Sequence, residues 1–478
     1  MKVFRRAAVA ALVMTASSLW AADPGVTFAG RGEIKGDSSD KSGLRGDICQ
    51  KENPANCIPK STLGGLGSAL AYSGFDNVFL AFPDRGPFDG RTDGSYLDRF
   101  HFLHLDVDLS VSPSHGALNI AATLLDTRLL KSEGNENFVG DANAIDSPVL
   151  RFDPEGAAVS RDGTIYISDE YGPYINEFNR QGHLLRRIVL PSRYLISHPT
   201  GDADSAGNSF ELYPTTSNPI PPGGGNDSGR QANRGMEGLT ITPDGRYLVG
   251  IMQNALIQDN GLNTSVPPGR RGLNNRILKI DLLTGATQEF VYTLDAINQG
   301  RGVNDMLAIN DHEFLVLERD NRSNRPTPPN DVQNPNLKRI YKIDLAKPGL
   351  SDVSSVNVLP ENPDGFVNFF GPGKNLVAVT KTKFIDMLDP AYVVDSTASP
   401  VQTIRSVIAE KMEGMAWGPA LPDGRLLLYV ISDNDLYRGL PTQIYAFAID
   451  PAAAQITFQR QVTSEPLFPP GQVKKLVP

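Results

Sequence analysis

The chain has 478 residues but little of what many enzymes rely on: two cysteines, six histidines and two tryptophans. It lacks the G-x-S-x-G pattern of α/β-hydrolases and the H-E-x-x-H pattern of zinc proteases. Its net charge of −9 argues against a nucleic-acid partner, which requires a basic surface. Beyond the N-terminus, no apolar run is long enough to cross a bilayer. Candidate functional groups are therefore sought among the carboxylates.

The first 22 residues have the pattern of a secretory signal peptide. A basic start, residues 1–6, precedes an apolar stretch, residues 7–20, and the small pair Ala21-Ala22. A buried N-terminal helix is the alternative, but the basic start and the small-residue exit favour a cleaved leader. We therefore expect a periplasmic or secreted protein whose mature domain is residues 23–478.

The two cysteines, Cys49 and Cys57, lie close together in a segment rich in Pro and Asn. In an oxidising compartment this arrangement favours a disulfide. A two-cysteine metal site is the alternative, but the segment lacks the C-x-x-C spacing and a nearby histidine. We therefore expect a disulfide that closes a small loop.

What the sequence does contain is a pattern that returns along the chain. Each copy has a Gly or acidic start, a short apolar strand, a turn, and a second apolar strand that ends on acidic residues. Asp-Gly forms the turn in three copies and is a strong hairpin signal, because Gly accepts the positive φ that the turn requires. The copies occupy residues 64–86, 152–173, 235–254, 304–320 and 411–435, and a sixth unit is assigned to 365–388.

An array of equivalent all-β units is typical of propeller blades. We therefore predict an all-β fold, a single β-propeller of six blades, with seven as the alternative. Residues 443–450 and 455–461 are expected to pair with N-terminal material and close the ring, which removes exposed sheet edges. Other outer strands are expected at 102–109, 276–294 and 339–346, and long surface loops at 199–235, 258–274 and 321–337.

Several blocks of the repeat resemble a known family. Residues 167–178 (ISDEYGPYINEF), with residues 154–156, 237–246, 315–320, 410–414 and 432–435, resemble the phytase-like domain, also called "esterase-like activity of phytase". The resemblance extends over about residues 60–450. It implies a secreted or periplasmic β-propeller with phosphoesterase or esterase activity. The chain shows no clear match to the calcium-dependent propeller phytases beyond general architecture, so phytate is not implied as the substrate.

Carboxylates recur at equivalent positions of the repeat and are expected to converge on one face of the ring. They begin three copies, and a second acidic set follows the apolar strands. Carboxylates brought together raise one another's pKa unless a cation neutralises them. Oxygen ligands in such number suit Ca²⁺. The predicted metal ligands are Glu155, Asp169, Glu237, Glu318, Glu413 and Asp433.

Basic residues are interleaved with these acids and suit an anionic substrate. Arginine offers a planar fork that matches phosphate or carboxylate. We therefore assign candidate catalytic roles to Glu170, Glu237, Arg319 and Lys411. The alternative explanations are structural: glutamates that accept backbone hydrogen bonds between blades, and basic residues that form inter-blade ion pairs.

The predicted function is a calcium-dependent phosphoesterase or esterase that acts on a small anionic substrate. A lactonase-type hydrolase on the same architecture is one alternative. A non-enzymatic propeller that binds a ligand or a protein and holds structural calcium is the other. We expect a monomer with no nucleic-acid partner and no membrane span.

Overall fold

The computed structural model describes residues 23–92, 96–141, 150–195, 228–231, 233–263, 269–270, 272–295, 302–324, 332–356, 358, 370–371 and 374–477. The expected signal peptide, residues 1–22, lies outside the described residues. Among the helices of the described part of the chain, none is both long and apolar enough to pass through a membrane.

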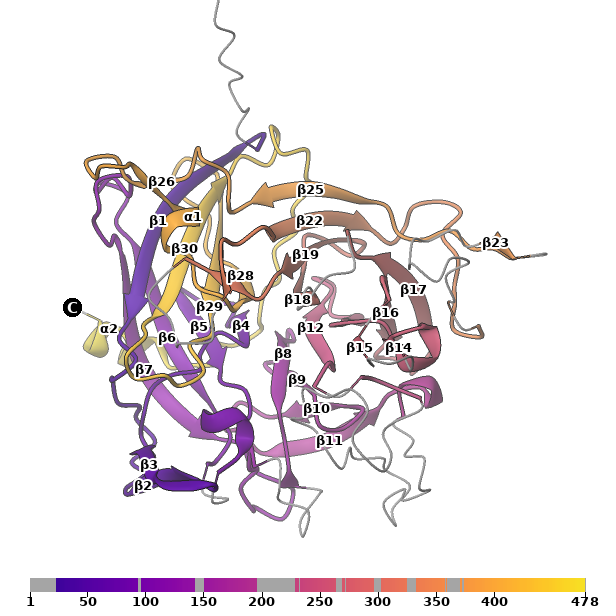
Figure 1. Ribbon diagram of the computed structural model, residues 1–478, viewed down its shortest axis with the longest axis horizontal. Helices are drawn as coiled ribbons and strands as arrows, with labels where there is room; N and C mark the ends of the chain where they lie inside the picture. The colour runs from indigo at the N-terminus through magenta and orange to yellow at the C-terminus, as the bar shows by residue number, and fades with distance from the viewer. Residues whose placement is uncertain are drawn as a thin grey trace, which may run out of the picture.

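Five four-stranded antiparallel sheets surround a central axis as the blades of a propeller (Figure 1). From the innermost strand outward, blade 1 contains β4 (Ala69–Tyr72), β5 (Val78–Phe82), β6 (Arg99–Val107) and β7 (Ile120–Leu129), and blade 2 contains β8 (Pro154–Val159), β9 (Ile165–Asp169), β10 (Tyr174–Phe178) and β11 (Leu184–Val189). Blade 3 contains β12 (Met236–Ile241), β13 (Tyr247–Met252), β16 (Asn274–Asp281) and β17 (Thr287–Thr293). Blade 4 contains β18 (Gly302–Ala308), β19 (Glu313–Arg319), β22 (Lys338–Asp344) and β25 (Lys381–Asp386), and blade 5 contains β28 (Met412–Trp417), β29 (Leu426–Ser432), β30 (Thr442–Ile449) and β1 (Val26–Ile34).

The remaining elements are short and lie between or beside the blades. They are β2 (Asp47–Gln50), β3 (Asn53–Pro59), η1 (Pro87–Gly90), η3 (Ser192–Tyr194), η4 (Ile257–Asp259), β14 (Leu262–Asn263), β15 (Gly269–Arg270), β20 (Arg322–Ser323), β21 (Val332–Gln333), β23 (Phe370–Gly371), β24 (Lys374–Asn375), β26 (Val393–Asp395), β27 (Gln402–Thr403), α1 (Ile404–Val407) and α2 (Pro470–Leu476).

The two ends of the chain close the ring within blade 5. Strand β1 pairs antiparallel with β30, from Val26 opposite Ile449 to Ile34 opposite Thr442. The innermost strands also contact one another in a closed circle, in the order β4, β8, β12, β18 and β28. The expected pairing of residues 443–450 with N-terminal material is therefore confirmed, whereas residues 455–461 form no strand. This closure protects the edge that an open sheet array would expose.

The all-β propeller prediction is confirmed, but the prediction of six blades is wrong: the described residues form five. The supposed sixth unit, residues 365–388, supplies one strand to blade 4 instead of a blade of its own. Strand β25 pairs with β22, with Ile385 opposite Ile340, and so completes that sheet as its outermost strand. The short pair of β23 and β24 forms a separate two-stranded sheet. Sequence similarity could not distinguish a fourth strand from a new first strand.

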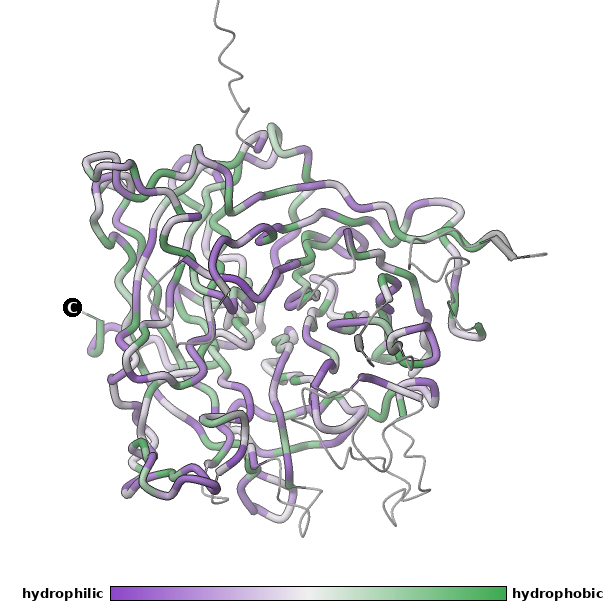
Figure 2. Tube along the Cα trace, in the orientation of Figure 1, coloured by the Kyte–Doolittle hydropathy of each residue, from purple (hydrophilic) through white to green (hydrophobic). Residues whose placement is uncertain are grey.

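The core is divided among the spaces between neighbouring blades. Five large clusters of buried apolar side chains each combine residues from two adjacent blades. In the cluster between blades 5 and 1, for example, Phe79 of β5 meets Tyr429 of β29, with ring centroids 5.1 Å apart. Figure 2 accordingly shows hydrophobic segments distributed through all the blades. Face-to-face packing of sheets, repeated around the ring, therefore holds the domain together.

The predicted Asp-Gly turns are confirmed and connect the first two strands of three blades. Their glycines, Gly163, Gly245 and Gly424, have φ values of 84°, 76° and 86°. This region of φ is open to Gly and costly for residues with a Cβ. The three turns lie at the opposite ends of the innermost strands from the acidic residues. Each of these strands therefore runs from the acidic end toward its turn.

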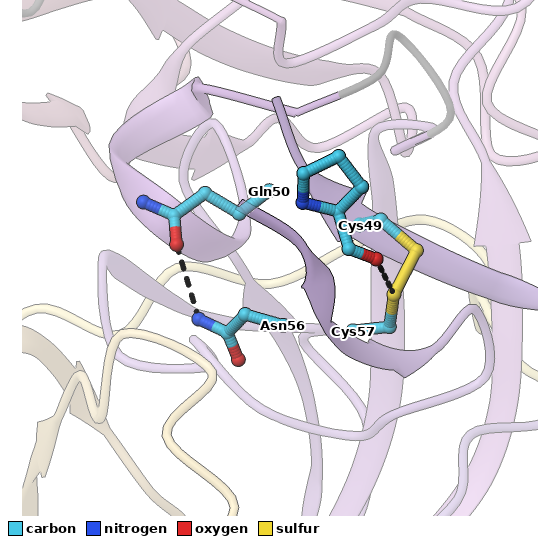
Figure 3. The surroundings of a disulfide bond; sticks show 5 residues. Cys49, Gln50, Asn56 and Cys57 are labelled. Atoms are coloured by element: carbon cyan, nitrogen blue, oxygen red, sulfur yellow. Dashed lines mark hydrogen bonds between the residues drawn. A yellow bond between two sulfur atoms is a disulfide. The ribbon is translucent and has the colours of Figure 1, made fainter. Parts of the chain in front are cut away.

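The predicted disulfide is present between Cys49 and Cys57, which face each other in the hairpin of β2 and β3 (Figure 3). A hydrogen bond from Asn56 to Gln50 lies beside it in the same hairpin. The hairpin packs its buried Ile48 and Ile58 in a small apolar cluster with Tyr96 and Leu436. It therefore buttresses the loop that follows β29, which reaches the site described below.

Candidate functional site

Four of the innermost strands carry a β-bulge where the acidic repeat begins. The register shifts occur in β8, β12, β18 and β28. A bulge leaves a residue out of the hydrogen-bonding ladder and redirects its side chain. The redirected positions hold Glu155, Glu237, Asn304 and Glu413, one from each of four blades.

The glycine after each of these glutamates allows the innermost strands to approach one another. A Cβ at Gly156 would lie 2.5 Å from the backbone nitrogen of Leu239 in the next blade. A Cβ at Gly238 would lie 2.6 Å from that of Met306, and one at Gly414 would lie 2.9 Å from that of Leu70. In each Glu-Gly pair, the glutamate supplies a side chain to the site, and the glycine allows neighbouring innermost strands to pack closely because it has no side chain.

The redirected glutamates line a cavity of about 270 Å³ at one end of the ring. We call this cavity the acidic mouth. Second strands and the loops after them supply the rest of its wall. The residues that line it are Asp84, Arg85, Glu155, Glu170, Asn233, Arg234, Glu237, Gln253, Arg319, Asn321, Glu410, Lys411, Glu413 and Asp435.

Three basic residues of the acidic mouth already have carboxylate partners. Arg85 Nη1 lies 2.8 Å from Asp153 Oδ2 and 3.3 Å from Glu170 Oε2. Arg319 Nη2 lies 2.5 Å from Glu413 Oε1. These ion pairs join residues of different blades and hold the wall of the cavity in a fixed arrangement.

Lys411 is bound by the acidic loop after β29. Its Nζ lies 2.5 Å from Asp435 Oδ1 and 3.1 Å from Asp433 Oδ2, and 3.9 Å from Asp84 Oδ2. Burial alone would lower the pKa of Lys411, but the carboxylates of Asp435 and Asp433 raise it well above its ordinary value. Burial in turn raises the pKa of Asp84 to about 6. The lysine therefore stays charged and serves as a built-in counter-ion.

Glu155 and Glu237 differ from the other acids of the mouth. Both are buried, and within the described part of the chain neither makes a hydrogen bond or an ion pair. Burial, and then the charge of Glu237, raises the pKa of Glu155 well above its usual range. Burial, and then Glu170 and Glu413, does the same for the pKa of Glu237. The charged form of both carboxyl groups is therefore disfavoured, and a bound cation would relieve that cost.

Two neutral oxygens accompany the unpartnered pair. The side-chain oxygens of Asn233 and Gln253 line the same cavity, are buried, and have no hydrogen-bond partner in the described residues. Two carboxylates and two amide oxygens form an all-oxygen donor set of the kind that hard cations such as Ca²⁺ prefer. Among the described residues, the ligand oxygens of Glu155, Asp153 and Glu170 lie within 4.8 Å of one another, close enough to share a metal ion. Glu237, Asn233 and Gln253 line the same cavity and are further candidate ligands of a divalent cation.

The structure brings together most of the residues that the sequence singled out. Glu155, Glu170, Glu237, Arg319, Lys411 and Glu413 all line the acidic mouth. Asp433 lies directly behind it and holds Lys411. Their convergence from four blades depends on the bulges and on the equivalent ends of the strands.

Asp169 and Glu318 lie outside the cavity. Asp169 Oδ1 accepts hydrogen bonds from the backbone N–H groups of Asp153 and Tyr171. Glu318 Oε1 accepts a hydrogen bond from Tyr292 at 2.5 Å and lies 2.5 Å from Lys381 Nζ. Successive residues of a strand point to opposite faces, so these two side chains face away while their neighbours, Glu170 and Arg319, face the cavity.

Sequence reasoning missed Gln253, Glu410 and Asn321 as residues of the cavity wall. A signal existed for Gln253, since it directly follows β13 as Glu170 directly follows β9. Its side chain is an amide, whereas the prediction relied on acidic residues at this position. Glu410 lies in the block 410–414 that carries the family resemblance, whereas no comparable signal marks Asn321.

Fold and site together define a five-bladed propeller with a charged cavity where the innermost strands begin. The family model "Phytase-like: Esterase-like activity of phytase" matches residues 61–436, and the chain belongs to this family. An uncharacterized secreted protein of Arthroderma benhamiae is 28% identical over 333 residues, which cover 57% of this chain and 62% of that protein. The chain thus spans less than two thirds of that relative's length.

Solved structures with a similar course of the chain are distant. The allergen Mala s 1 of Malassezia sympodialis has 11% sequence identity and a TM-score of 0.36, and the match covers 91% of this chain and 99% of that one. The calcium-binding protein regucalcin of Agrobacterium tumefaciens has 10% identity and a TM-score of 0.32, with 84% and 95% covered. These scores are low, so the blade arrangement rests on the sheet pairing of this chain itself.

Proposed function

We propose that the protein is an exported hydrolase of small anionic esters, phosphoric or carboxylic, that depends on a divalent cation, calcium in the first place. The observation that carries the proposal is the set of four cavity-lining side chains, Glu155, Glu237, Asn233 and Gln253, whose oxygens lack partners in the described residues. Membership in the phytase-like family agrees with ester hydrolysis. The secreted relative agrees with export.

The roles of the residues follow from their contacts. Glu155 and Glu237 would hold the cation, which, when bound, polarises an ester oxygen and makes water a better nucleophile. Glu170 is anchored by Gly235 N–H at 2.8 Å and by Arg85, so its carboxylate has a fixed position on the wall. Arg319 and Lys411 keep Glu413, Asp433 and Asp435 in place and act as positioning residues. Substrate enters from the open side of the cavity.

The test is a panel of p-nitrophenyl phosphate, p-nitrophenyl acetate and a simple lactone, assayed with calcium and with a chelator. We expect calcium-dependent cleavage of at least one ester and loss of that cleavage in Glu237→Gln. Glu52→Gln, at an exposed position of the β2–β3 hairpin, is the matched control and should behave as the wild type.

Each other outcome has a definite meaning. A calcium-induced rise in Tm without cleavage of any substrate would replace the proposal by the ligand-binding propeller with structural calcium. Cleavage of the lactone alone would favour the lactonase-type hydrolase. If calcium does not bind and no substrate is cleaved, both the cation site and the hydrolase activity are ruled out.

A further inference from the structure

The four basic residues of the acidic mouth are not equivalent. Arg85, Arg319 and Lys411 each form at least one ion pair of 2.8 Å or shorter with a carboxylate. Their charge is already neutralised inside the protein. Arg234 forms no ion pair within the part of the chain that the structure describes, although it lines the same cavity.

The guanidinium of Arg234 also retains most of its donors. Its Nη1 donates to the backbone oxygen of Asn233 at 2.7 Å, and a guanidinium has five N–H donors. Protein atoms surround the side chain, yet it stays partly exposed to solvent through the mouth. Burial lowers its pKa below the ordinary value, while Glu170 and Glu237 oppose that shift. A ligand can therefore reach the remaining donors.

The backbone holds Arg234 in position. Its own N–H donates to Gln231 O at 3.1 Å, and the next residue, Gly235, donates to Glu170 Oε1 at 2.8 Å. A Cβ at Gly235 would lie 2.8 Å from Glu170 Cα, so the chain is pressed against that residue. The base of the arginine side chain is thus fixed beside the candidate cation ligand Glu237, three residues further along the chain.

The charge of the rest of the wall is unfavourable to anions. The lining includes seven carboxyl groups, from Asp84, Glu155, Glu170, Glu237, Glu410, Glu413 and Asp435, and four basic groups. Three of these basic groups are paired, and the proposed cation is held by its own carboxylate ligands. A second anionic substituent would therefore meet the remaining carboxylates once the first has bound Arg234. Like charges at short distance in a partly desolvated cavity repel strongly.

We infer that Arg234 is the specificity-determining residue of the site and binds a single anionic group. The substrate class is then an ester that carries one anionic group, and not a compound with many phosphates. This inference rests on the proposed function. Arginine suits the role because its fork can bind a phosphate or carboxylate with two parallel hydrogen bonds.

The experiment measures binding of inorganic phosphate to the mature chain by titration calorimetry in the presence of calcium. We expect one phosphate per chain and at least about a tenfold weaker affinity in Arg234→Gln, equivalent to about 1.4 kcal/mol. Arg234→Lys should lose less, because it keeps the charge but not the fork. Arg161→Gln removes an exposed arginine beside the turn after β8 and is the matched control, expected to bind as the wild type.

Steady-state kinetics provide the second measurement. In Arg234→Gln, we expect a higher KM for p-nitrophenyl phosphate and an unchanged KM for the neutral p-nitrophenyl acetate. Far-ultraviolet circular dichroism and Tm establish that each variant is folded. If Arg234→Gln does not fold, Arg234→Lys replaces it as the test variant. Inositol hexakisphosphate is the multiply phosphorylated comparison and should bind no more tightly than inorganic phosphate.

The inference and the proposed function fail in different ways. Unchanged phosphate affinity in Arg234→Gln, binding of two phosphates, or preference for inositol hexakisphosphate would overturn the role of Arg234 even in an active enzyme. Absence of phosphate binding in the wild type would overturn it too. Phosphate bound through Arg234 without cleavage of any ester would instead leave the anion site intact and overturn the hydrolase.

Discussion

The two ends of the central ring are built from the same five strands and differ in almost every physical property. One end is the acidic mouth. The other, which we call the closed floor, is a cavity of about 50 Å³ lined by the later residues of β4, β8, β12, β18 and β28. Strand β8 shows the contrast within six residues: Glu155 reaches the mouth, whereas Val159 lines the floor.

The floor is closed by the segment after β30. Trp417 stacks edge-on against Phe458, with centroids 5.0 Å apart, and its Nε1 donates to Ala308 O at 2.9 Å. Gln459 N–H donates to Ile309 O at 2.9 Å, and Arg460 Nη1 donates to Gly418 O at 2.9 Å. Polar groups at the floor therefore mostly find partners, whereas the mouth keeps a few buried oxygens without them.

Packing and the candidate binding site therefore lie at opposite ends of the same short strands. Burying a carboxyl group without a partner costs free energy, so a fold keeps such groups where a ligand can compensate for them. Substitutions at the floor should then change stability without changing binding. Substitutions at the mouth should do the opposite.

The largest expected effect is at the floor. Trp417→Ala removes a buried side chain and should lower the free energy of unfolding by about 3–5 kcal/mol, the usual cost for loss of a large buried aromatic. Urea denaturation measures this change, and Trp417→Phe should cost less. Calcium affinity of the folded fraction should equal that of the wild type. A large change in that affinity would mean that the two ends are coupled.

A smaller effect of opposite sign is expected at the mouth. Glu237→Gln removes a buried, unpaired carboxyl group and should raise the free energy of unfolding without calcium by roughly 1 kcal/mol, because repulsion by Glu170 and Glu413 is lost. The rise in Tm that calcium causes in the wild type should nearly disappear. A variant that is destabilised and keeps the calcium response would contradict the role assigned to Glu237.

The smallest effect is a pH dependence that separates the two ends. Burial raises the pKa of Asp84 and of Asp169 to about 6 from 3.8, and that of Glu237 also lies above its ordinary value. Asp84 and Asp169 contribute stability that is fully present below the unfolded-state pKa and is lost as pH rises through about 6. Calcium displaces protons from its ligands, so the calcium-induced rise in Tm should be larger at pH 8 than at pH 5.

Thermal melts of the wild type, Glu237→Gln and Trp417→Phe at both pH values measure that difference. Trp417→Phe should retain the wild-type dependence, since the floor holds none of the candidate ligands. Glu237→Gln should show little dependence. An equal calcium response at both pH values in the wild type would show that the carboxyl groups of the mouth are charged before the cation binds.

Some features of the fold could be predicted from the sequence because they depend on residues that are close together in the chain. The Asp-Gly turns at Gly163 and Gly245 require local backbone conformations, and the apolar runs beside them have strand periodicity. Cys49 and Cys57 sit opposite each other in one hairpin, so their pairing was visible from their closeness. The family resemblance relied on such local blocks and was confirmed.

Other features depended on contacts far apart in the chain. Lys381–Asp386 became the last strand of blade 4 because it pairs with β22, and this pairing lowered the blade count from six to five. Clustered carboxylates taken alone predict a metal, yet Arg319 reaches Glu413, 94 residues away, and Lys411 reaches three aspartates. Internal cations neutralise much of the cluster.

The sequence by itself determined most of the strands, the Asp-Gly turns, the disulfide and the family, since each follows from short-range conformational preference or from a local motif. Only the tertiary structure decided the number of blades and the difference between Glu237, Arg234 and their charged neighbours. Whether a charged group is paired depends on which side of a strand it occupies and which blade lies opposite. Long-range packing of sheets, together with bulges that redirect single side chains, determines both.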